Sequence, residues 1–318
     1  MSTISITKTS GKITSEIFHL DINQYDIPQS CSVYLLVTPN SIVIMDIGTS
    51  NDVYSILEFL KVNNLPLKKV KFLIPSHHHF DHFGGGWKLW ERIKKKNPQV
   101  KVLTTKETKL QLQDSQEHLK RAKRTFGERI GLMNPLPEEA YEIIETNKSI
   151  PIPGLEKQLK LIATPGHTSD HVCPIIINNG ETEFVYLGES AGGLLHSQLL
   201  LTVPSSMPPD FNFNTYIRSL RKLIDLRPIN IGYAHSGVVQ GQEAAKRVLE
   251  EHLDFSFFFR DFVKDKFTER GETRFVVEQF IEQEMKKRSE ANNHKLYINY
   301  VVAVVYGQLV DLGLKEPK

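Results

Sequence analysis

Over its first two thirds the chain alternates between short apolar runs and amphipathic stretches. Three runs, Glu16–Leu20, Ser32–Thr38 and Ile42–Ile47, are rich in β-branched and aromatic side chains, as strands are. In residues 50–63 apolar side chains recur every three or four positions, which predicts an amphipathic helix. The run Val70–Ile74 predicts a buried strand that ends directly before a histidine-rich loop.

Further strands and helices continue this alternation. The predicted strands are Val100–Thr104, Gln158–Ala163, Val172–Ile177, Glu183–Leu187 and Ile229–Tyr233, and the predicted helices are Trp87–Lys96 and Phe213–Leu226. Residues 106–150 are predicted to form a helical insertion with many basic side chains. Its basic face is either solvated or turned toward a substrate as a lid.

The last part of the chain has a different pattern. It predicts three helices, Ala244–Lys266, Arg274–Arg288 and Leu296–Leu312, with no convincing strand. The third helix is apolar almost all round, so it should be buried. The phenylalanines between residues 255 and 262 pack in the core, line an apolar pocket or form a dimer contact, and the sequence does not choose among these roles.

Composition narrows the class of protein. The chain has 318 residues, a net charge of +2 and 40% hydrophobic residues, which excludes a disordered chain and a collagen-like repeat. The small net charge disfavours a large basic surface for nucleic acid. Cys31 and Cys173 make no disulfide framework and fit a reduced setting. With no signal-peptide pattern and no apolar run long enough to span a bilayer, we expect a cytoplasmic protein without membrane contact.

Four of the 12 histidines lie within six residues, directly after a predicted buried strand. The stretch Ser76–His82 contains the pattern H-x-H-x-D-H. In an extended loop His77 and His79 point to the same side because side chains alternate, whereas Asp81 and His82 turn to a second direction as a helix begins. Imidazole and carboxylate groups suit zinc, iron or manganese, so this loop offers ligands to two neighbouring metals.

More polar residues stand at predicted strand ends. His167, Glu189 and His235 each follow an apolar run, and strand ends that are distant in sequence converge on one edge of a packed sheet. Asp46 ends an early strand and is expected to orient the histidine loop from behind. His171 is expected to support the ligands from behind or to contact the substrate, with simple strand packing as the alternative.

These motifs, in this order, resemble those of the metallo-β-lactamase superfamily of metallohydrolases. The five motifs are Asp46-Ile47-Gly48, His77 to His82, His167, Glu189 and His235. The resemblance implies an α/β fold, an αββα sandwich, for a catalytic domain at residues 1–241. A helical C-terminal extension at residues 242–318 would follow it.

The resemblance also implies a ligand set. The first metal would be bound by His77, His79 and His167, and the second by Asp81, His82 and His235, with Glu189 as the bridge. Zinc is the first choice for both divalent metals, with iron or manganese as alternatives. Metal ions lower the pKa of bound water to about 7, so a hydroxide would be present at neutral pH. Asp81 would orient that hydroxide and accept its proton, as the catalytic carboxylate.

One ligand position departs from the superfamily pattern. Members usually have Asp where this chain has Glu189, so the sequence leaves the occupancy of the second site open. No cysteine lies in a ligand motif, so antibiotic hydrolysis through a cysteine-containing zinc site is not expected. The remaining histidines are expected to be structural or ordinary surface residues: His19, His78, His118, His196, His252 and His294.

The expected substrate is a small molecule. The stretch Thr164–His171 is similar to that of hydroxyacylglutathione hydrolases and acyl-homoserine lactonases, which favours hydrolysis of an ester, thioester or lactone. The later motifs Gly188–Gly193 and Pro208–Phe211 look like those of a poorly characterised hydrolase group. Three alternatives stay open: a nuclease or phosphodiesterase, an iron oxidoreductase of the persulfide dioxygenase type, and a non-catalytic metal-binding protein. A homodimer through the C-terminal helices is also expected.

Overall fold

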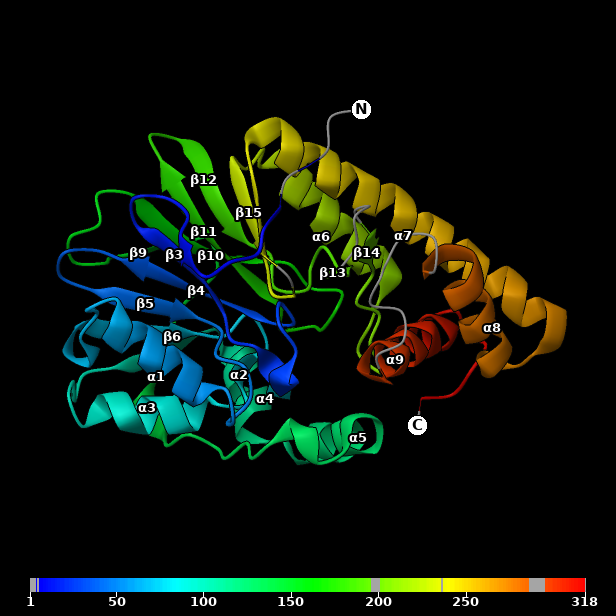
Figure 1. The fold of residues 1–318 in the computed structure, drawn as a ribbon, viewed down its shortest axis with the longest axis horizontal. Coiled ribbons are helices and arrows are strands. Elements are labelled where there is room, and N and C mark those ends of the chain that lie inside the picture. Colours follow the sequence, from blue (N-terminus) through cyan, green and yellow to red (C-terminus); the bar gives the residue numbers. More distant parts are fainter. Residues whose placement is uncertain (1–3, 5, 196–200, 236, 286–294, 318) are drawn as a thin grey trace.

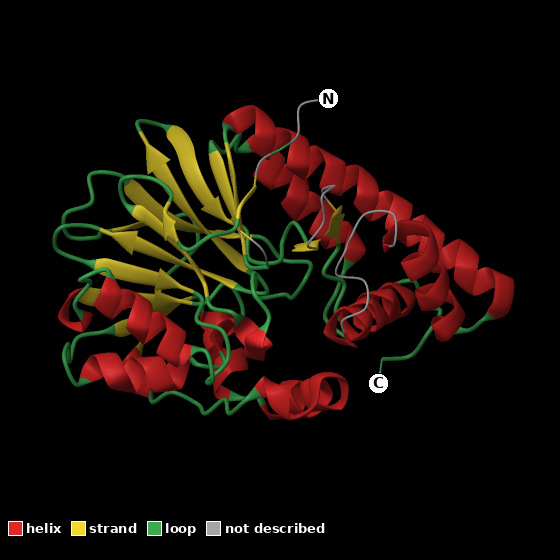
Figure 2. Cartoon of the chain, viewed as in Figure 1, coloured by secondary structure: helices red, strands yellow, loops and turns green. Residues whose placement is uncertain are grey.

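Two seven-stranded mixed sheets lie face to face, with helices on both outer sides (Figures 1 and 2). The computed structural model of the chain describes residues 4, 6–195, 201–235, 237–285 and 295–317. This architecture confirms the predicted αββα sandwich with a helical extension at its C-terminal end.

The strands are short, and each sheet mixes parallel and antiparallel pairs. In order across the first sheet they are β2 (Gly11–Lys12), β3 (Ile17–Asp21), β4 (Ser32–Val37), β5 (Ile42–Met45), β6 (Val70–Ile74), β7 (Lys101–Thr104) and β8 (Tyr141–Ile143). Across the second they are β1 (Ile6–Thr7), β16 (Gly237–Gln240), β15 (Asn230–Tyr233), β12 (Glu181–Tyr186), β11 (Val172–Asn178), β10 (Gln158–Ala163) and β9 (Ser149–Ile150). A separate two-stranded sheet pairs β13 (Gly193–Leu195) antiparallel with β14 (Leu201–Val203).

The apolar residues of the strands fill three layers. On β4, Tyr34 and Leu36 face the second sheet and pack with Phe184 and other buried residues, whereas Leu35 faces outward. Because both faces of the central strands are covered, these strands are apolar at nearly every position instead of alternating with polar residues. The outer layers pack under helices: α1 (Val53–Val62) and α3 (Gly86–Lys94) cover the first sheet, and α6 (Phe213–Asp225) and α7 (Gln242–Arg270) cover the second.

The C-terminal helices build a further apolar core. Phe259 of α7 packs there with Phe280 of α8 (Thr273–Phe280) and with Val304 of α9 (Lys295–Asp311). The helix α9 also reaches α5 (Gln116–Phe126), where the Asn299 side chain donates a hydrogen bond to the Thr125 carbonyl oxygen at 3.0 Å. The extension therefore contacts the insertion that follows β7.

The predicted phenylalanine-rich stretch has more than one environment. Phe259 is fully buried in the C-terminal core, whereas Phe257 and Phe258 are exposed on α7. The dimer contact expected of these helices stays a prediction. No helix in the described part of the chain is long and apolar enough to cross a membrane.

The structure differs from the predicted elements at several short segments. The stretch predicted to be helical at 106–150 contains α4 (Lys106–Gln113) and α5, but residues 141–143 form the parallel edge strand β8 and residues 149–150 form β9. The first helix begins at Val53, because residues 50–52 form a turn in which the Asp52 amide donates to the Thr49 carbonyl oxygen at 3.1 Å.

Candidate metal centre

The histidine loop leaves the carboxyl end of β6 and turns at once into the short helix α2 (Phe80–Phe83). Asp46, at the end of the neighbouring strand β5, anchors this loop from behind. Its carboxylate accepts hydrogen bonds from the Ser76 amide at 2.6 Å, the Ser76 hydroxyl at 2.7 Å, the Tyr186 hydroxyl at 2.5 Å and His82 Nδ1 at 2.8 Å. Because His82 Nδ1 donates to Asp46, His82 Nε2 is the ring nitrogen that faces away from Asp46 and that a metal could bind.

The Nε2 atom of His82 shows whether a metal fits this site. His82 Nε2 is buried and has no hydrogen-bond partner, although buried polar atoms are nearly always satisfied. The same tautomer holds at His77 and His167, since their Nδ1 atoms lie 3.0 Å from the Ser76 hydroxyl and 2.5 Å from the Ser205 carbonyl oxygen. The Nε2 atoms of all three rings then converge. Burial lowers the pKa of His82 and His167, but the neighbouring carboxylates, Asp81 and Asp46 at His82 and Glu189 at both rings, outweigh burial and raise it. The site therefore stabilises positive charge, and this donor set fits a cation that replaces those protons.

The first group of ligand atoms comes from His77, His79, His167 and Glu189, which all lie within 4.8 Å of one another. His167 Nε2 is 3.2 Å from His77 Nε2, 3.1 Å from His79 Nδ1 and 2.7 Å from Glu189 Oε2. Burial, followed by the neighbouring imidazoles, holds the pKa of both His77 and His79 well below its ordinary value. Both rings are therefore neutral, which is the form that binds metals.

The second group consists of Asp81, His82 and His235. Asp81 Oδ2 is 3.8 Å from His82 Nε2 and 3.9 Å from His235 Nε2. His235 Nδ1 lies 2.8 Å from the Ser30 carbonyl oxygen, so its Nε2 is free to face the group. All three residues follow the carboxyl ends of β6 and β15, one strand from each sheet, and the 3.9 Å between Asp81 Oδ2 and His235 Nε2 shows that these two strand ends meet at one edge of the sandwich.

Glu189 stands between the two groups. Its Oε2 is 3.5 Å from His77 Nε2 and 3.4 Å from His82 Nε2, and its Oε1 is 3.7 Å from His235 Nε2. Burial raises the pKa of this carboxyl, but the surrounding imidazoles, His167 above all, outweigh burial and hold the pKa well below its usual value. Glu189 is therefore an ionised carboxylate placed where it can contact ions in both groups.

His171 supports Glu189 from behind. Its Nε2 accepts a hydrogen bond from the Glu189 amide at 3.1 Å, and its Nδ1 lies 2.8 Å from the Thr164 hydroxyl. The ring stacks on His77, and burial lowers the pKa of His171 to about 3. A Cβ at Gly188 would lie 2.5 Å from His171 Nε2, so a glycine is needed there. His171 is not among the residues that line the cavity above the centre.

Of the two roles expected for His118, an ordinary surface residue or a satisfied structural one, its contacts fit the second, and they place it beside the metal centre. The ring, on α5, stacks on His79 with 4.7 Å between centroids, and its Nε2 accepts a hydrogen bond from the Phe80 amide at 3.2 Å. The ring of His78 lies 5.1 Å from that of His118, and His78 Nδ1 lies 2.9 Å from Asp170 Oδ1. His78 and His118, with His79, make a third group close enough to hold an ion.

The other histidines lie away from the centre. His19 is buried with Nε2 2.8 Å from the Ser32 hydroxyl, and His252 is buried between the hydroxyls of Tyr216 and Thr202. Both are satisfied structural residues. His196 and His294 lie outside the described residues.

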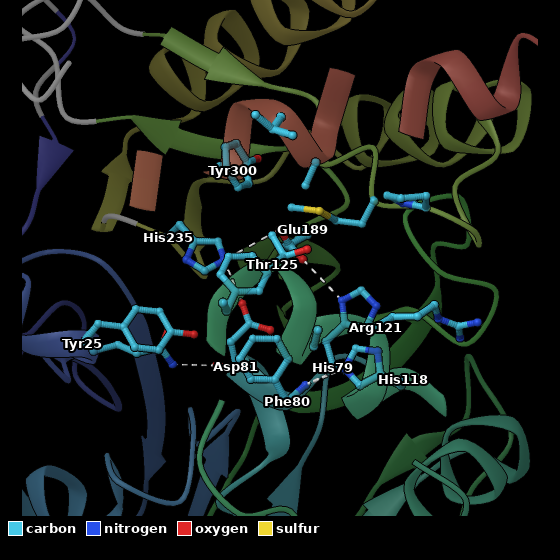
Figure 3. A pocket seen from close by; sticks show the side chains of 18 of the residues that line it. Tyr25, His79, Phe80, Asp81, His118, Arg121, Thr125, Glu189, His235 and Tyr300 are labelled. Atoms are coloured by element: carbon cyan, nitrogen blue, oxygen red, sulfur yellow. Dashed lines mark hydrogen bonds and ion pairs between the residues drawn. The ribbon is translucent and has the colours of Figure 1, made fainter. Parts of the chain in front are cut away.

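A cavity of about 410 Å³ opens directly above the metal-binding groups (Figure 3). Asp81, Glu189 and His235 reach it from below. Its walls come from α5, from residues 207–210 and from α9, so the insertion and the C-terminal extension both contribute to it.

Tyr300 is the polar group that α9 adds to this cavity. Its hydroxyl lies 3.2 Å from the Ser205 hydroxyl, next to the carbonyl that holds His167. Burial, followed by the charges of Glu189 and Asp81, raises the pKa of Tyr300, so it stays a hydrogen-bond donor. Sequence patterns gave no sign of this role, because Tyr300 lies in a helix that reads as apolar core.

Comparisons with known proteins agree with this geometry. A family model described as the metallo-beta-lactamase superfamily matches residues 26–235, which include every candidate ligand. The chain is 28% identical over 233 residues to the metallo-beta-lactamase fold-containing protein ST1585 of Sulfurisphaera tokodaii, covering 72% of this chain and 79% of that protein. It is 27% identical over 158 residues to a hydroxyacylglutathione hydrolase of Prochlorococcus marinus, covering 50% of this chain and 48% of that protein.

Solved structures show the same fold. The crystal structure of ST1585 superposes with a TM-score of 0.58 at 24% identity, over 76% of this chain and 86% of that one. The metallo-beta-lactamase family protein TTHA1429 of Thermus thermophilus gives a TM-score of 0.58 at 16% identity, over 89% of this chain and 88% of that one. From its fold and the match across residues 26–235, the chain belongs to the metallo-beta-lactamase superfamily.

Proposed function

We propose that the chain is a metal-dependent hydrolase that cleaves an ester, thioester or lactone at a centre for two divalent metals. The observation that carries this proposal is the position of Glu189 between two groups of ligand atoms, beneath a cavity large enough for a small molecule. His77, His79 and His167 would hold one ion, and Asp81, His82 and His235 the other, with Glu189 shared between them.

When bound, such ions lower the pKa of coordinated water and polarise the carbonyl oxygen of a substrate. The chain supplies the remaining parts of the reaction. Asp81, whose side chain is 21% exposed, faces the cavity and is placed to orient the attacking water and to accept its proton. The Tyr300 hydroxyl faces the same space and donates a hydrogen bond to the oxygen on which negative charge develops.

The substrate class is supported by two observations. Residues of α9 form one wall of the cavity, and its volume of about 410 Å³ suits a small molecule better than a polynucleotide. The relative from Prochlorococcus marinus is named as a hydroxyacylglutathione hydrolase, which favours acyl hydrolysis. We also propose that residues 1–241 hold the metal ligands and that residues 242–318 complete the cavity wall.

The test combines metal analysis with a substrate panel. Purified protein should contain two equivalents of zinc, iron or manganese, and chelation should remove activity that added metal restores. It should hydrolyse at least one of p-nitrophenyl acetate, a thioester and a homoserine lactone. Asp81→Asn should lower kcat by roughly a hundredfold or more while the fold survives. Turnover of bis-p-nitrophenyl phosphate alone, or a protein without stoichiometric metal, would overturn the proposal.

A further inference from the structure

Helix α5 has two chemically different faces. His118, Arg121, Ala122 and Thr125 recur at the spacing of one helical face and all line the cavity above the metal centre. The neighbouring lysines do not line this cavity and have acidic partners. Lys120 lies 3.6 Å from Glu117 and Lys123 lies 2.7 Å from Glu128.

Two guanidinium groups on this wall have no such partner. Arg121 and Arg124 both line the cavity, and within the described ranges neither forms an ion pair or a hydrogen bond. Arg121 is half-buried, and Figure 3 shows it beside His118, with Tyr25 at the other side of the view. An arginine kept partly out of water without a carboxylate is a ready site for an oxyanion, which it can bind with two parallel hydrogen bonds.

No acidic residue of the cavity neutralises this charge. Asp81 and Glu189 are lining carboxylates that belong to the metal-binding groups. Asp210 also lines the cavity, but it is exposed and makes no ion pair with either arginine. The α5 side of the cavity therefore carries two positive charges, half-buried on Arg121 and exposed on Arg124, that no carboxylate among the described residues pairs with.

Most of the remaining wall is apolar. It is lined by Phe126 of α5, by Met207 and Pro208 of the loop after β14, and by Val302 and Ala303 of α9. A ligand that fills the cavity would place hydrocarbon against these side chains. Its reacting carbonyl would lie near Asp81 and Glu189, and a charged end would lie near the arginines.

We propose that the substrate is an acyl compound that carries a carboxylate, and that Arg121 binds this carboxylate while Arg124 adds to the positive rim. This inference rests on the proposed hydrolase function and specifies its substrate. The reaction is hydrolysis: the oxygen of water bonds to the acyl carbon, the bond to the leaving oxygen or sulfur breaks, and the leaving group takes a proton. No co-reactant besides water is required.

The test compares esters that differ only in one carboxylate. The first pair is p-nitrophenyl hexanoate and mono-p-nitrophenyl adipate, with the charge on the acyl side. The second pair is 4-methylphenyl acetate and 4-acetoxyphenylacetic acid, with the charge on the leaving group. In at least one pair the wild-type protein should prefer the charged ester in kcat/KM by roughly tenfold or more, the size of a charge-assisted hydrogen bond.

Variants of α5 assign this preference. Arg121→Met keeps an apolar stem and should abolish the preference while the neutral ester is still hydrolysed. Lys123→Met removes the same charge from a position of α5 outside the cavity and should keep the preference. Arg121→Lys should keep part of it, because the ammonium lacks the paired donors. An equal loss in Arg121→Met and Lys123→Met would mean a general charge effect and would overturn the inference.

Product binding gives a second measurement that does not depend on turnover. Adipate should bind more tightly than hexanoate to the wild-type metal-loaded protein, and Arg121→Met should remove that difference in calorimetry. If both neutral and charged esters are hydrolysed equally and adipate has no advantage, the carboxylate inference fails while the hydrolase proposal stands. If no ester, thioester or lactone is hydrolysed, the hydrolase proposal fails, and the inference about a substrate fails with it.

Discussion

Asp46→Asn is the substitution that most directly tests how the centre is organised. Four donor contacts converge on the Asp46 carboxylate: the Ser76 amide, the Ser76 hydroxyl, the Tyr186 hydroxyl and His82 Nδ1. An asparagine has one acceptor oxygen and a donor NH₂ group, so at least one buried donor must face another donor. With the amide oxygen at the Oδ2 position, the NH₂ group opposes the Ser76 amide at the start of the histidine loop.

The cost can be worked out from these contacts. One orphaned buried donor costs about 1–3 kcal/mol, and the loss of the negative charge weakens the three hydrogen bonds that remain. We therefore expect the free energy of unfolding of the metal-free protein to fall by about 3 kcal/mol. Since His82 belongs to the second ligand group, metal affinity there should fall roughly 10- to 100-fold, with a smaller effect on the first group.

The assay is a metal titration of the metal-free protein together with denaturant unfolding. Asp311→Asn is a matched control, because Asp311 is a mostly buried carboxylate that accepts a hydrogen bond from the Phe213 amide, far from the centre along α9. It should lower stability without changing metal affinity. If Asp46→Asn leaves the second metal as tightly bound as in the wild-type protein, Asp46 does not orient His82 and the reasoning is wrong.

Three further predictions follow from single contacts. Tyr300→Phe should lower kcat about tenfold or more with unchanged metal content, because only the hydroxyl beside Ser205 is lost. Tyr306→Phe is the control and should retain full kcat, because the Tyr306 hydroxyl donates its hydrogen bond to the Glu316 carbonyl oxygen instead. Glu189→Asp should lower the affinity for the second metal, because the shorter side chain moves the carboxylate away from His82 Nε2, now at 3.4 Å, and from His235 Nε2, now at 3.7 Å. Equal metal stoichiometry in both proteins would show that the extra methylene has no effect. Burial lowers the pKa of His252 to about 3, so the folded protein protonates this ring only at a much lower pH than the unfolded chain does. The free energy of unfolding therefore decreases as the pH falls below about 6.5. Between pH 7 and pH 5 the wild-type protein should lose about 2 kcal/mol of unfolding free energy through this ring, and His252→Gln should lose about 2 kcal/mol less than the wild type in denaturant unfolding. An equal pH dependence in both proteins would contradict the assignment.

The ligand groups could be foreseen because strand ends carry them. The predicted bounds of Val70–Ile74 agree with the structure, and His77, His79, Asp81 and His82 follow directly from that strand. A buried parallel strand has a clear apolar signal. The contacts of His82 with Glu189 and of Asp81 with His235 show that its carboxyl end lies beside the ends of β12 and β15 in the other sheet. The positions of such residues can be predicted without knowledge of side-chain packing.

Short edge strands have no comparable signal. Among the described strands, Tyr141–Ile143 pairs with β7 alone, and Glu142 and Ile143 are exposed. A strand of three residues with so little apolar pattern cannot be told from the helical pattern that precedes it. Gly237–Gln240 has four residues and follows β15 almost at once. In both cases the partner strand determines the structure, and a local pattern cannot show the partner.

The cavity-lining role of the helices that cover the centre could not be predicted from the sequence, for a different reason. An apolar helix such as α9 is expected to be buried on every side, and Val301, Val304 and Val305 are indeed in the C-terminal core. Yet Tyr300, which also packs against that core, and Ala303 of the same helix line the cavity. A cavity for an apolar substrate and a packed core select the same residue types, so hydropathy alone cannot separate them. On α5 the corresponding ambiguity is between a solvated basic face and a binding face, and the acidic partners of Lys120 and Lys123, with none for Arg121 among the described residues, are what separate the two.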